Sequence, residues 1–229
     1  MPYLLPLAVP LCFLLTALAA TTGPQMRPRR VLALARWLSL LAFVFALASG
    51  AVLIFAGSGE ARLGQSAYLL SLRLDVVSLP MLVLVAFIGW IVTGFSATYL
   101  DGEARQRSFT FWMALTLASV SFFILSGSLA VLVVSFIATS LCLHQLLLFY
   151  PERPAARRAA WKKFIVSRVA DAALVVAAVL LWFGYGTADI AEILAGARAG
   201  LSPPEAVAAA ALLAVAALIK SAQFPTHGW

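Results

Sequence analysis

The stretch PEAVAAAALLAVAALIKSAQFPTHGW, residues 204–229, decides the class of fold. Its first two thirds are almost wholly apolar, and about 20 such residues are enough to cross the hydrocarbon core of a membrane. We therefore expect a membrane-spanning helix over residues 204–224. Lys220 lies within this span, where a charged side chain costs several kcal/mol unless other groups compensate it. This lysine is the first candidate functional residue.

The composition of the whole chain agrees with a membrane protein. Hydrophobic residues make up 63% of the 229 residues, and charged residues make up only 11%. Soluble domains contain about 45–50% apolar and about 25% charged residues. A soluble fold of this composition would leave large apolar patches facing water. We therefore interpret the chain as an all-α polytopic membrane protein.

Apolar runs of membrane-spanning length recur along the chain. They predict seven transmembrane helices, over residues 3–22, 31–57, 77–99, 109–126, 128–150, 165–186 and 204–224. Between the last two, residues 187–205 show helical spacing that predicts a short surface helix. We expect a single membrane domain over residues 1–229. Because Trp229 follows the last span so closely, we also expect the sequence to be a fragment of a longer protein.

The basic residues lie in short clusters between the apolar runs. The net charge is +7, but the basic residues form no extended basic face and are not interleaved with aromatic residues. We therefore expect no nucleic-acid partner. Cytoplasmic connections of membrane proteins carry an excess of Lys and Arg. One side of the predicted topology receives Arg27, Arg29, Arg30, Arg36, Arg105, Arg107, Arg153, Arg157, Arg158, Lys162, Lys163 and Arg168, and the other receives Arg62, Arg73 and Arg198. This asymmetry predicts an N-terminus outside the cell.

The surroundings of Lys220 point to proton transfer. Burial disfavours the charged form of a lysine and brings proton exchange within reach. Pro225 has no N–H for the carbonyl of Ser221, so we expect the seventh helix to break there, and broken helices at membrane depth line wet cavities. Gln223 and His227 then share a polar face with Lys220. The alternative is a lysine whose amine reaches out to the membrane surface.

Two other spans contain ionisable residues. Arg168 and Asp171 lie three residues apart in FIVSRVAD, residues 164–171, and this spacing predicts an ion pair on one helix face. The pair has either a structural role or a place on a proton path. His144 lies four residues after Ser140 on the fifth span, and it is either a hydrogen-bonded structural residue or a proton relay.

Other chemistries have little support in the sequence. Nucleophile motifs, glycine-rich phosphate loops and clusters of metal-ligating residues are absent, and Cys12 and Cys142 both lie inside apolar runs. We therefore expect a transport subunit with no catalytic site, cofactor or metal of its own.

Three motifs resemble one family of membrane proteins. AALIKSAQFPTHGW (216–229) is similar to the seventh-helix signature of antiporter-like proton-translocating subunits, which include subunit L of NADH–quinone oxidoreductase and the Mrp antiporters. LRLDVVSLPMLVLVAFIG (72–89) and RRAAWKKFIVSRVAD (157–171) resemble its third and sixth helices. The resemblance implies a module of about fourteen helices, of which this chain is the N-terminal half. It also implies a proton-carrying role for Lys220, with Arg168 and Asp171 as the family's sixth-helix pair.

The fifth helix departs from the respiratory subunits. Those carry a W-E-x-x-G-L-C-S-Y motif, whereas FIATSLCLH (136–144) has Ile137 at the position of the glutamate. This segment looks more like the DabB-type subunits of inorganic carbon transporters. That resemblance implies proton conduction in a bacterial inner membrane, which drives a DabA-type partner that carries a zinc site. A respiratory subunit L and an Mrp-type Na+/H+ antiporter subunit are the alternatives.

Overall fold

The computed structural model describes residues 2–63 and 70–222, and most of them are helical. The chain forms two compact units. Unit 1 comprises Met1–Ala61 and Leu72–Leu125, and unit 2 comprises Arg62–Ser71 and Ser126–Trp229. The expectation of a single membrane domain over residues 1–229 stays a prediction.

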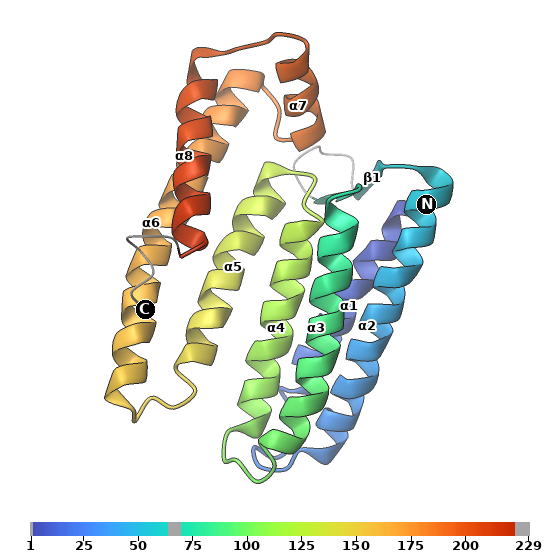
Figure 1. The fold of residues 1–229 in the computed structure, drawn as a ribbon, viewed down its shortest axis with the longest axis vertical. Coiled ribbons are helices and arrows are strands. Elements are labelled where there is room, and N and C mark those ends of the chain that lie inside the picture. The colour runs from blue at the N-terminus through green and yellow to red at the C-terminus, as the bar shows by residue number, and fades with distance from the viewer. Residues whose placement is uncertain (1, 64–69, 223–229) are drawn as a thin grey trace. The chain divides into compact units, whose positions relative to one another are not determined.

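Unit 1 is a bundle of apolar helices (Figure 1). Its elements are η1 (Pro2–Leu7), α1 (Ala8–Ala19), α2 (Arg29–Ala56), α3 (Ser78–Tyr99) and α4 (Gln106–Ile124). Helix α1 packs against α2 and α4, and α2 packs against α3. Fully buried alanines such as Ala42, Ala86 and Ala118 lie in the core beside Phe13. Small side chains let apolar helices approach closely, which is how helices associate in a membrane.

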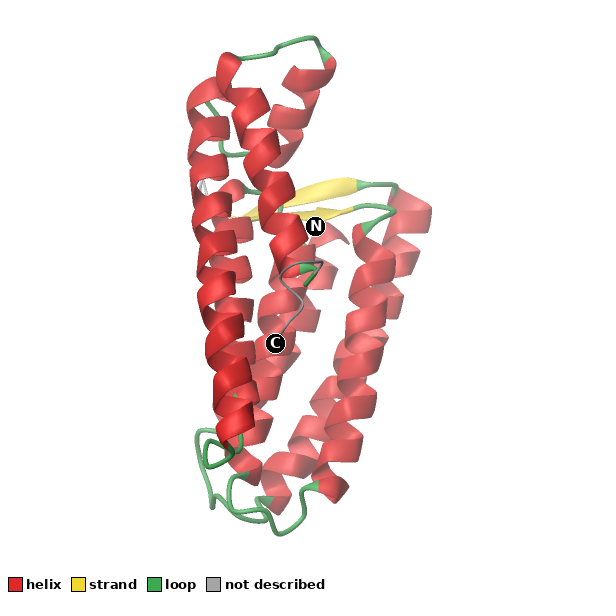
Figure 2. Ribbon diagram, turned by 60° about the vertical axis from the view of Figure 1, so that its left-hand side comes forward, coloured by secondary structure: helices red, strands yellow, loops and turns green. Residues whose placement is uncertain are grey.

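Unit 2 carries the candidate site on three long helices. Its helices are α5 (Leu129–Leu147), α6 (Pro154–Tyr185), α7 (Ile190–Arg198) and α8 (Pro204–Lys220). Helix α8 runs back along α6, and α5 packs against α6 (Figures 1 and 2). The short helix α7 lies at the end of this unit where α6 ends and α8 begins. The predicted surface helix within residues 187–205 is thus present.

One pair of strands occurs among the described residues (Figure 2). Strand β1 (Gly59–Leu63) pairs with β2 (Leu70–Leu74) in the connection between α2 and α3. The division between the two units passes through this hairpin. In unit 2, the backbone N–H of Gly127 donates to the carbonyl of Ser71 at 2.8 Å. The sequence predicted no strands in this connection, because the two strands are too short to show a clear alternating pattern.

The helical membrane fold is confirmed, and each predicted span overlaps a helix among the described residues. Among the described residues, five helices are long and apolar enough to cross a membrane: Arg29–Ala56, Ser78–Tyr99, Gln106–Ile124, Leu129–Leu147 and Pro154–Tyr185. The apolar helix at Tyr3–Ala19 and the 17-residue helix α8 are shorter, so five rather than seven spans meet that criterion.

Helix α6 corrects one predicted boundary. We expected it to begin near residue 165, but it begins at Pro154 and includes the basic segment. Proline suits the first turn of a helix, since its missing N–H would have no partner there. Helix α8 ends at Lys220, and the predicted break at Pro225 lies outside the described residues.

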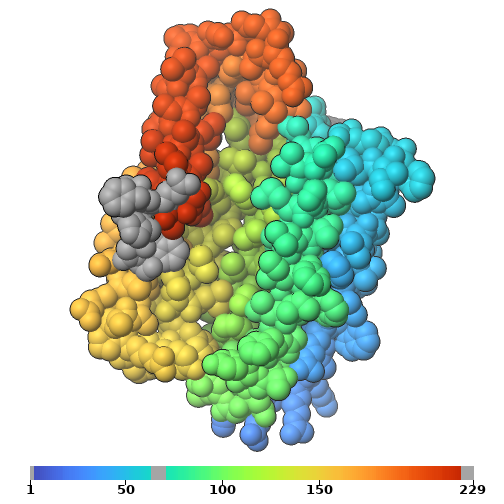
Figure 3. Space-filling model, viewed as in Figure 1, coloured from blue at the N-terminus to red at the C-terminus, as the bar shows by residue number. Residues whose placement is uncertain are grey.

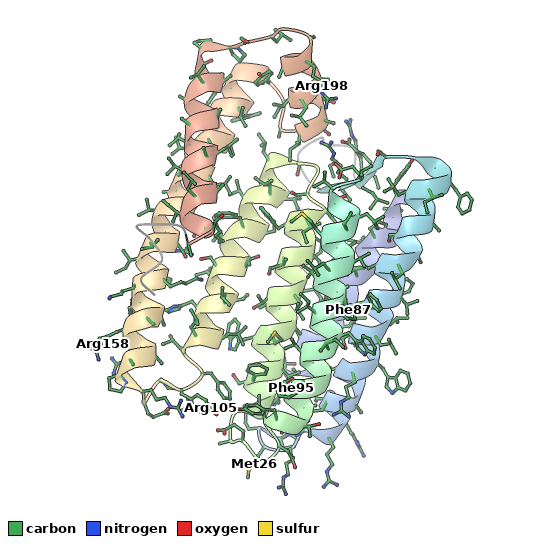
Figure 4. All side chains as sticks on the ribbon, in the orientation of Figure 1. Met26, Phe87, Phe95, Arg105, Arg158 and Arg198 are labelled. Carbon is green, nitrogen blue, oxygen red and sulfur yellow. The ribbon has the colours of Figure 1, made fainter. Side chains whose placement is uncertain are left out.

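The outer faces of the long helices are apolar. On α3, the side chains of Leu84, Phe87, Ile91 and Phe95 are all exposed, and Figure 3 shows this helix in green on the surface of unit 1. Figure 4 shows Phe87 and Phe95 pointing outward from α3. A row of large exposed apolar side chains is the surface that lipid requires. The chain is therefore a multi-pass membrane protein.

Candidate functional site

Helix α5 presents a buried polar stripe toward its neighbours in unit 2. Phe136, Ser140 and His144 follow one another at intervals of four residues, and all three are buried. Residues four apart share one face of a helix. Ser128 directly precedes this helix, and its hydroxyl accepts from the N–H of Val131 and so caps the first turn. This cap fixes the start of the helix that carries the stripe.

Helix α6 presents a matching stripe. Lys163, Ser167 and Asp171 also lie four residues apart and are buried. Because α6 packs against α5, the two stripes lie in one helix–helix interface. The Lys163 Nζ donates to the backbone carbonyl of Ser140 at 2.9 Å, which ties the stripes together.

The predicted pair on the sixth helix is an ion pair in the structure. The Arg168 Nη2 lies 2.6 Å from the Asp171 Oδ2, and the Asp171 side chain is only 6% exposed. The Arg168 guanidinium also lies 5.0 Å from the centre of the Phe164 ring, which is a cation–π distance. The pair thus places one carboxylate deep inside unit 2.

Lys220, the last residue of α8, directs its amine at α5. Its Nζ donates to the carbonyl of Phe136 at 3.3 Å and lies 3.8 Å from the centre of that ring. Asp171 lies within electrostatic range of the same amine. Lys220 is partly buried, and its amine is held by protein groups in this arrangement. The structure therefore brings Lys220 within electrostatic range of the carboxylate of the sixth-helix pair.

His144 lies near the end of α5 among aromatic rings. Its ring centre is 4.7 Å from that of Phe164 and 5.9 Å from that of Trp161. The Nδ1 atom is buried and has no hydrogen-bond partner among the described residues. A buried imidazole nitrogen without a protein partner usually contacts water.

Sequence reasoning missed Lys163. We assigned it to the basic connection before the sixth span, whereas the structure buries it to 4% exposure inside α6. Its neighbour Lys162 is exposed, so the two adjacent lysines have different roles in the fold. The spacing of Lys163, Ser167 and Asp171 was the signal that places this lysine on the inner face.

Two of the predicted site residues, Gln223 and His227, lie outside the described residues. Across residues 2–63 and 70–222, no group of three or more His, Cys, Asp or Glu side chains is placed to hold a metal ion.

Two carboxylates outside the membrane-spanning helices accept hydrogen bonds that lower their pKa. The Glu192 Oε2 accepts from the Thr187 hydroxyl at 2.6 Å, and this hydrogen bond, together with Arg62, lowers the pKa of Glu192. Burial of Asp75 favours its neutral form. The backbone N–H groups of Ser78 and Val77 and the Arg73 guanidinium outweigh that effect and hold the pKa of Asp75 below its ordinary value.

Comparison with protein families gives two matches. The family described as NADH:quinone oxidoreductase/Mrp antiporter, TM, matches residues 126–229. The family described as NADH-Ubiquinone oxidoreductase (complex I), chain 5 N-terminus, matches residues 62–110. All of the described candidate site residues lie in the first of these segments.

Several curated proteins are similar in sequence. The chain is 35% identical over 234 residues to the "Probable inorganic carbon transporter subunit DabB2" of Halothiobacillus neapolitanus, covering 99% of this chain and 42% of that protein. It is 42% identical over 155 residues to the corresponding DabB of Hydrogenovibrio crunogenus, covering 67% of this chain and 30% of that protein. NADH-quinone oxidoreductase subunit L of Escherichia coli is 30% identical over 161 residues, covering 69% of this chain and 26% of that protein.

A solved structure shares the fold. A chain of the membrane-bound sulfane sulfur reductase, an archaeal respiratory membrane complex, superposes with a TM-score of 0.79 at 16% identity. The match covers 100% of this chain and 46% of that chain. The chain thus spans less than half the length of the relatives that it matches.

Proposed function

Since the chain belongs to the antiporter-like family of proton-translocating membrane subunits through residues 62–110 and 126–229, we propose that its parent protein conducts protons and thereby drives uptake of inorganic carbon. Protons reach Lys220 inside the membrane and move along the polar groups of unit 2, which include Asp171, Arg168 and His144. Gln223 and His227 continue this path beyond the last turn of α8. The energy comes from protons moving down their gradient.

The observation that carries this proposal is the partner of Lys220. Its amine contacts the carbonyl and ring of Phe136, and the next residue on α5 is Ile137. A respiratory subunit of this family has a glutamate at that position, so the fifth-helix charge that accompanies the lysine there is missing here. The carboxylate near Lys220 comes from Asp171 on α6 instead.

Sequence similarity supports the carbon-transport branch. The match to the Halothiobacillus DabB2 covers 99% of this chain at 35% identity, whereas the match to the Escherichia coli subunit L covers 69% at 30%. We therefore place the parent protein with a DabA-type partner that binds zinc and takes up dissolved inorganic carbon. The zinc belongs to that partner, and this chain carries no cofactor.

We propose the bacterial inner membrane as the location, with the N-terminus outside. Nine of the sixteen Lys and Arg residues lie in the connections that this topology assigns to the cytoplasm or in the helical turns that adjoin them: Arg27, Arg29, Arg30, Arg105, Arg107, Arg153, Arg157, Arg158 and Lys162. In unit 2, Arg158 lies at one end of α6, and Arg198 lies on α7 at the other end (Figure 4). The positive-inside rule favours the orientation that keeps the larger cluster in the cytoplasm.

The alternative is a respiratory subunit L or an Mrp-type antiporter subunit, which the family match and the similarity to subunit L favour. Purification of the full-length parent protein with its genetic neighbours, in mild detergent, separates these functions. A single large zinc-containing partner supports the carbon transporter. A dozen subunits with flavin and iron–sulfur clusters refute it in favour of a respiratory complex, and transport that requires Na+ refutes it in favour of an antiporter.

The direct test of conduction is Lys220→Ala in the full-length protein with its partner. We expect coupled uptake of labelled bicarbonate to be abolished while the complex still assembles. Lys162→Ala is the matched control, because Lys162 is exposed on α6. Normal uptake by the Lys220→Ala complex would remove Lys220 from the mechanism.

A further inference from the structure

Lys163 is a second buried lysine in unit 2, and neither the family motifs nor the proposed function gives it a role. Its side chain lies between α5 and α6 with 4% exposure. Among the described residues, its one hydrogen bond goes to a neutral group, the carbonyl of Ser140. A charged ammonium has three donors, and a buried charge with one neutral acceptor is costly. Lys163 therefore needs further partners in this interface.

The interface around Lys163 contains several polar atoms that lack partners. Among the described residues, the Ser140 Oγ, the His144 Nδ1 and the Asp171 Oδ1 are all buried and form no hydrogen bond. Each of these side chains is more than nine-tenths buried. Buried polar groups in folded proteins nearly always have a partner, and water supplies it where the protein does not. Several such atoms along two facing stripes indicate a hydrated track rather than an isolated water.

The track leads from the basic end of unit 2 toward Lys220. Asp171 lies eight residues further along α6 than Lys163, which corresponds to about 12 Å along the helix axis. His144 lies within one turn of the end of α5, and Ser140 lies one turn deeper. From that end, His144 comes first and Lys163 with Ser140 comes next, and both the Phe136 carbonyl that holds Lys220 and the Arg168–Asp171 pair lie deeper.

We propose that Lys163 is a second proton-exchanging lysine, which relays protons through water between the His144 end of the α5–α6 interface and the Asp171–Lys220 site. Its amine accepts a proton from water on one side and releases one to water beside Ser140 and Asp171 on the other. The protein gains and loses one proton in each cycle. This inference rests on the proposed function, since it extends the same proton path.

Among the described residues, the charged and titratable groups that face this relay are in unit 2. Helix α5 contributes His144, α6 contributes Arg168 and Asp171, and α8 contributes Lys220. Arg168 does not release its proton. The single carboxylate among these groups is Asp171, so three cationic side chains share one anionic partner within the described part of unit 2. This arrangement favours a relay in which the lysines alternate between protonated and neutral forms.

The relay is tested by proton flux through the full-length parent protein in liposomes that enclose a pH-sensitive dye. We expect Lys163→Gln to lower the flux by about 100-fold or more, which is the smaller end of what a positioned proton-transfer group contributes. Lys163→Arg should lower it as far, because a guanidinium keeps its proton. Lys162→Gln, on the exposed face of the same helix, should keep the flux of the unmodified protein. Retained flux in Lys163→Arg would show a fixed positive charge and overturn the relay.

A second measurement tests the water without relying on conduction. After Cys12→Ala and Cys142→Ala, single cysteines are introduced as Ser140→Cys and Ser135→Cys, and their reaction with methyl methanethiosulfonate is followed. Thiolates react and thiols do not, and a thiolate forms only where water reaches the sulfur. Both serines are buried on α5, but the Ser135 hydroxyl is satisfied by the carbonyl of Leu132 at 3.2 Å.

The two measurements separate failure of the relay from failure of the proposed function. We expect the Ser140→Cys thiol to react and the Ser135→Cys thiol to stay unreacted. An unreactive Ser140→Cys overturns the hydrated track, even if the protein conducts protons. A reactive Ser140→Cys in a protein without proton flux keeps the track, but it overturns the proton relay together with the proposed function.

Discussion

The contact of Arg62 with Asp189 gives a prediction whose size follows from the structure. Asp189 precedes α7, and its side chain is only 1% exposed. Its Oδ1 accepts from the N–H groups of Ala191 and Glu192, at 2.9 and 3.3 Å, and so caps the helix. Its Oδ2 lies 2.9 Å from the Arg62 Nη2, and the Arg62 side chain is 50% exposed. Cap and ion pair thus use different oxygen atoms and are separable by substitution.

Three substitutions at this contact each remove a different set of interactions, and each should lower the free energy of unfolding. Asp189→Asn keeps the cap and loses the ion pair, and because Arg62 is then solvated we expect a cost of about 1 kcal/mol. Asp189→Ala loses the cap as well, for about 2 kcal/mol in all. Arg62→Ala leaves a buried carboxylate unpaired, and we expect about 2 kcal/mol, less than the cost in a fully buried pair.

The double variant Arg62→Ala with Asp189→Asn tests whether the cost of Arg62→Ala comes from the unpaired Asp189 carboxylate. It removes the unpaired charge, so its cost should fall back to about 1 kcal/mol, which corresponds to a coupling energy of about 2 kcal/mol between the two sites. Hydrogen–deuterium exchange of the α7 amides measures this locally, since 2 kcal/mol corresponds to about 30-fold faster exchange. The coupling would be refuted if the free-energy cost measured for the double variant equalled the sum of the costs of the two single variants.

Three further predictions concern stability of the full-length protein in detergent, measured by thermal unfolding through tryptophan fluorescence. The pKa of Asp75 is lowered in the folded state, so its stabilising contribution is present above about pH 4 and is lost as the pH falls through the lowered value. Asp75→Asn should make the stability depend less on pH in this range, and an unchanged pH profile would contradict the prediction. Gly127→Ala brings a Cβ into overlap with the Ser71 Oγ, so we expect a loss of about 1–3 kcal/mol, whereas Gly94→Ala meets nothing within 4 Å and should be tolerated; equal effects would refute the packing argument. Ser128→Ala removes the cap of α5 and should cost about 1 kcal/mol, and Ser128→Asn should restore it; a failure of asparagine to restore stability would exclude capping as the cause.

The hydropathy of the sequence predicts the spans well, because the requirement to cross a membrane dominates their composition. The predicted span 77–99 and the helix Ser78–Tyr99 differ by one residue at the start. Helix α6 shows where this reasoning fails. Its first eleven residues include four basic ones and fall outside the predicted span, but nothing in them opposes a helix after Pro154. A hydropathy pattern therefore gives the length of a membrane crossing, which differs from the length of a helix.

The β1–β2 hairpin was not predictable from the same signals. Its strands have five residues each, and the alternation in LSLRL (70–74) is too short to stand out beside long apolar runs. By contrast, the Arg168–Asp171 ion pair follows directly from a spacing of three residues on a helix. Contacts within one helix can be predicted from residue spacing, whereas contacts between strands or helices depend on packing that a single sequence does not determine.

The two adjacent lysines of α6 show why helical phase carries more information about a site than hydropathy does. Lys162 and Lys163 are the same type of residue and are adjacent in the sequence. However, consecutive residues on a helix point about 100° apart, so Lys162 is exposed and Lys163 is buried. Lys163 lies on the same face of α6 as Asp171. Its amine donates to the carbonyl of Ser140, which belongs to the polar stripe of α5. Because both stripes repeat every four residues, they carry polar groups at several depths of the same interface rather than at one. A path for protons requires such repetition, since a single buried charge gives a binding site and only a series of them gives a route.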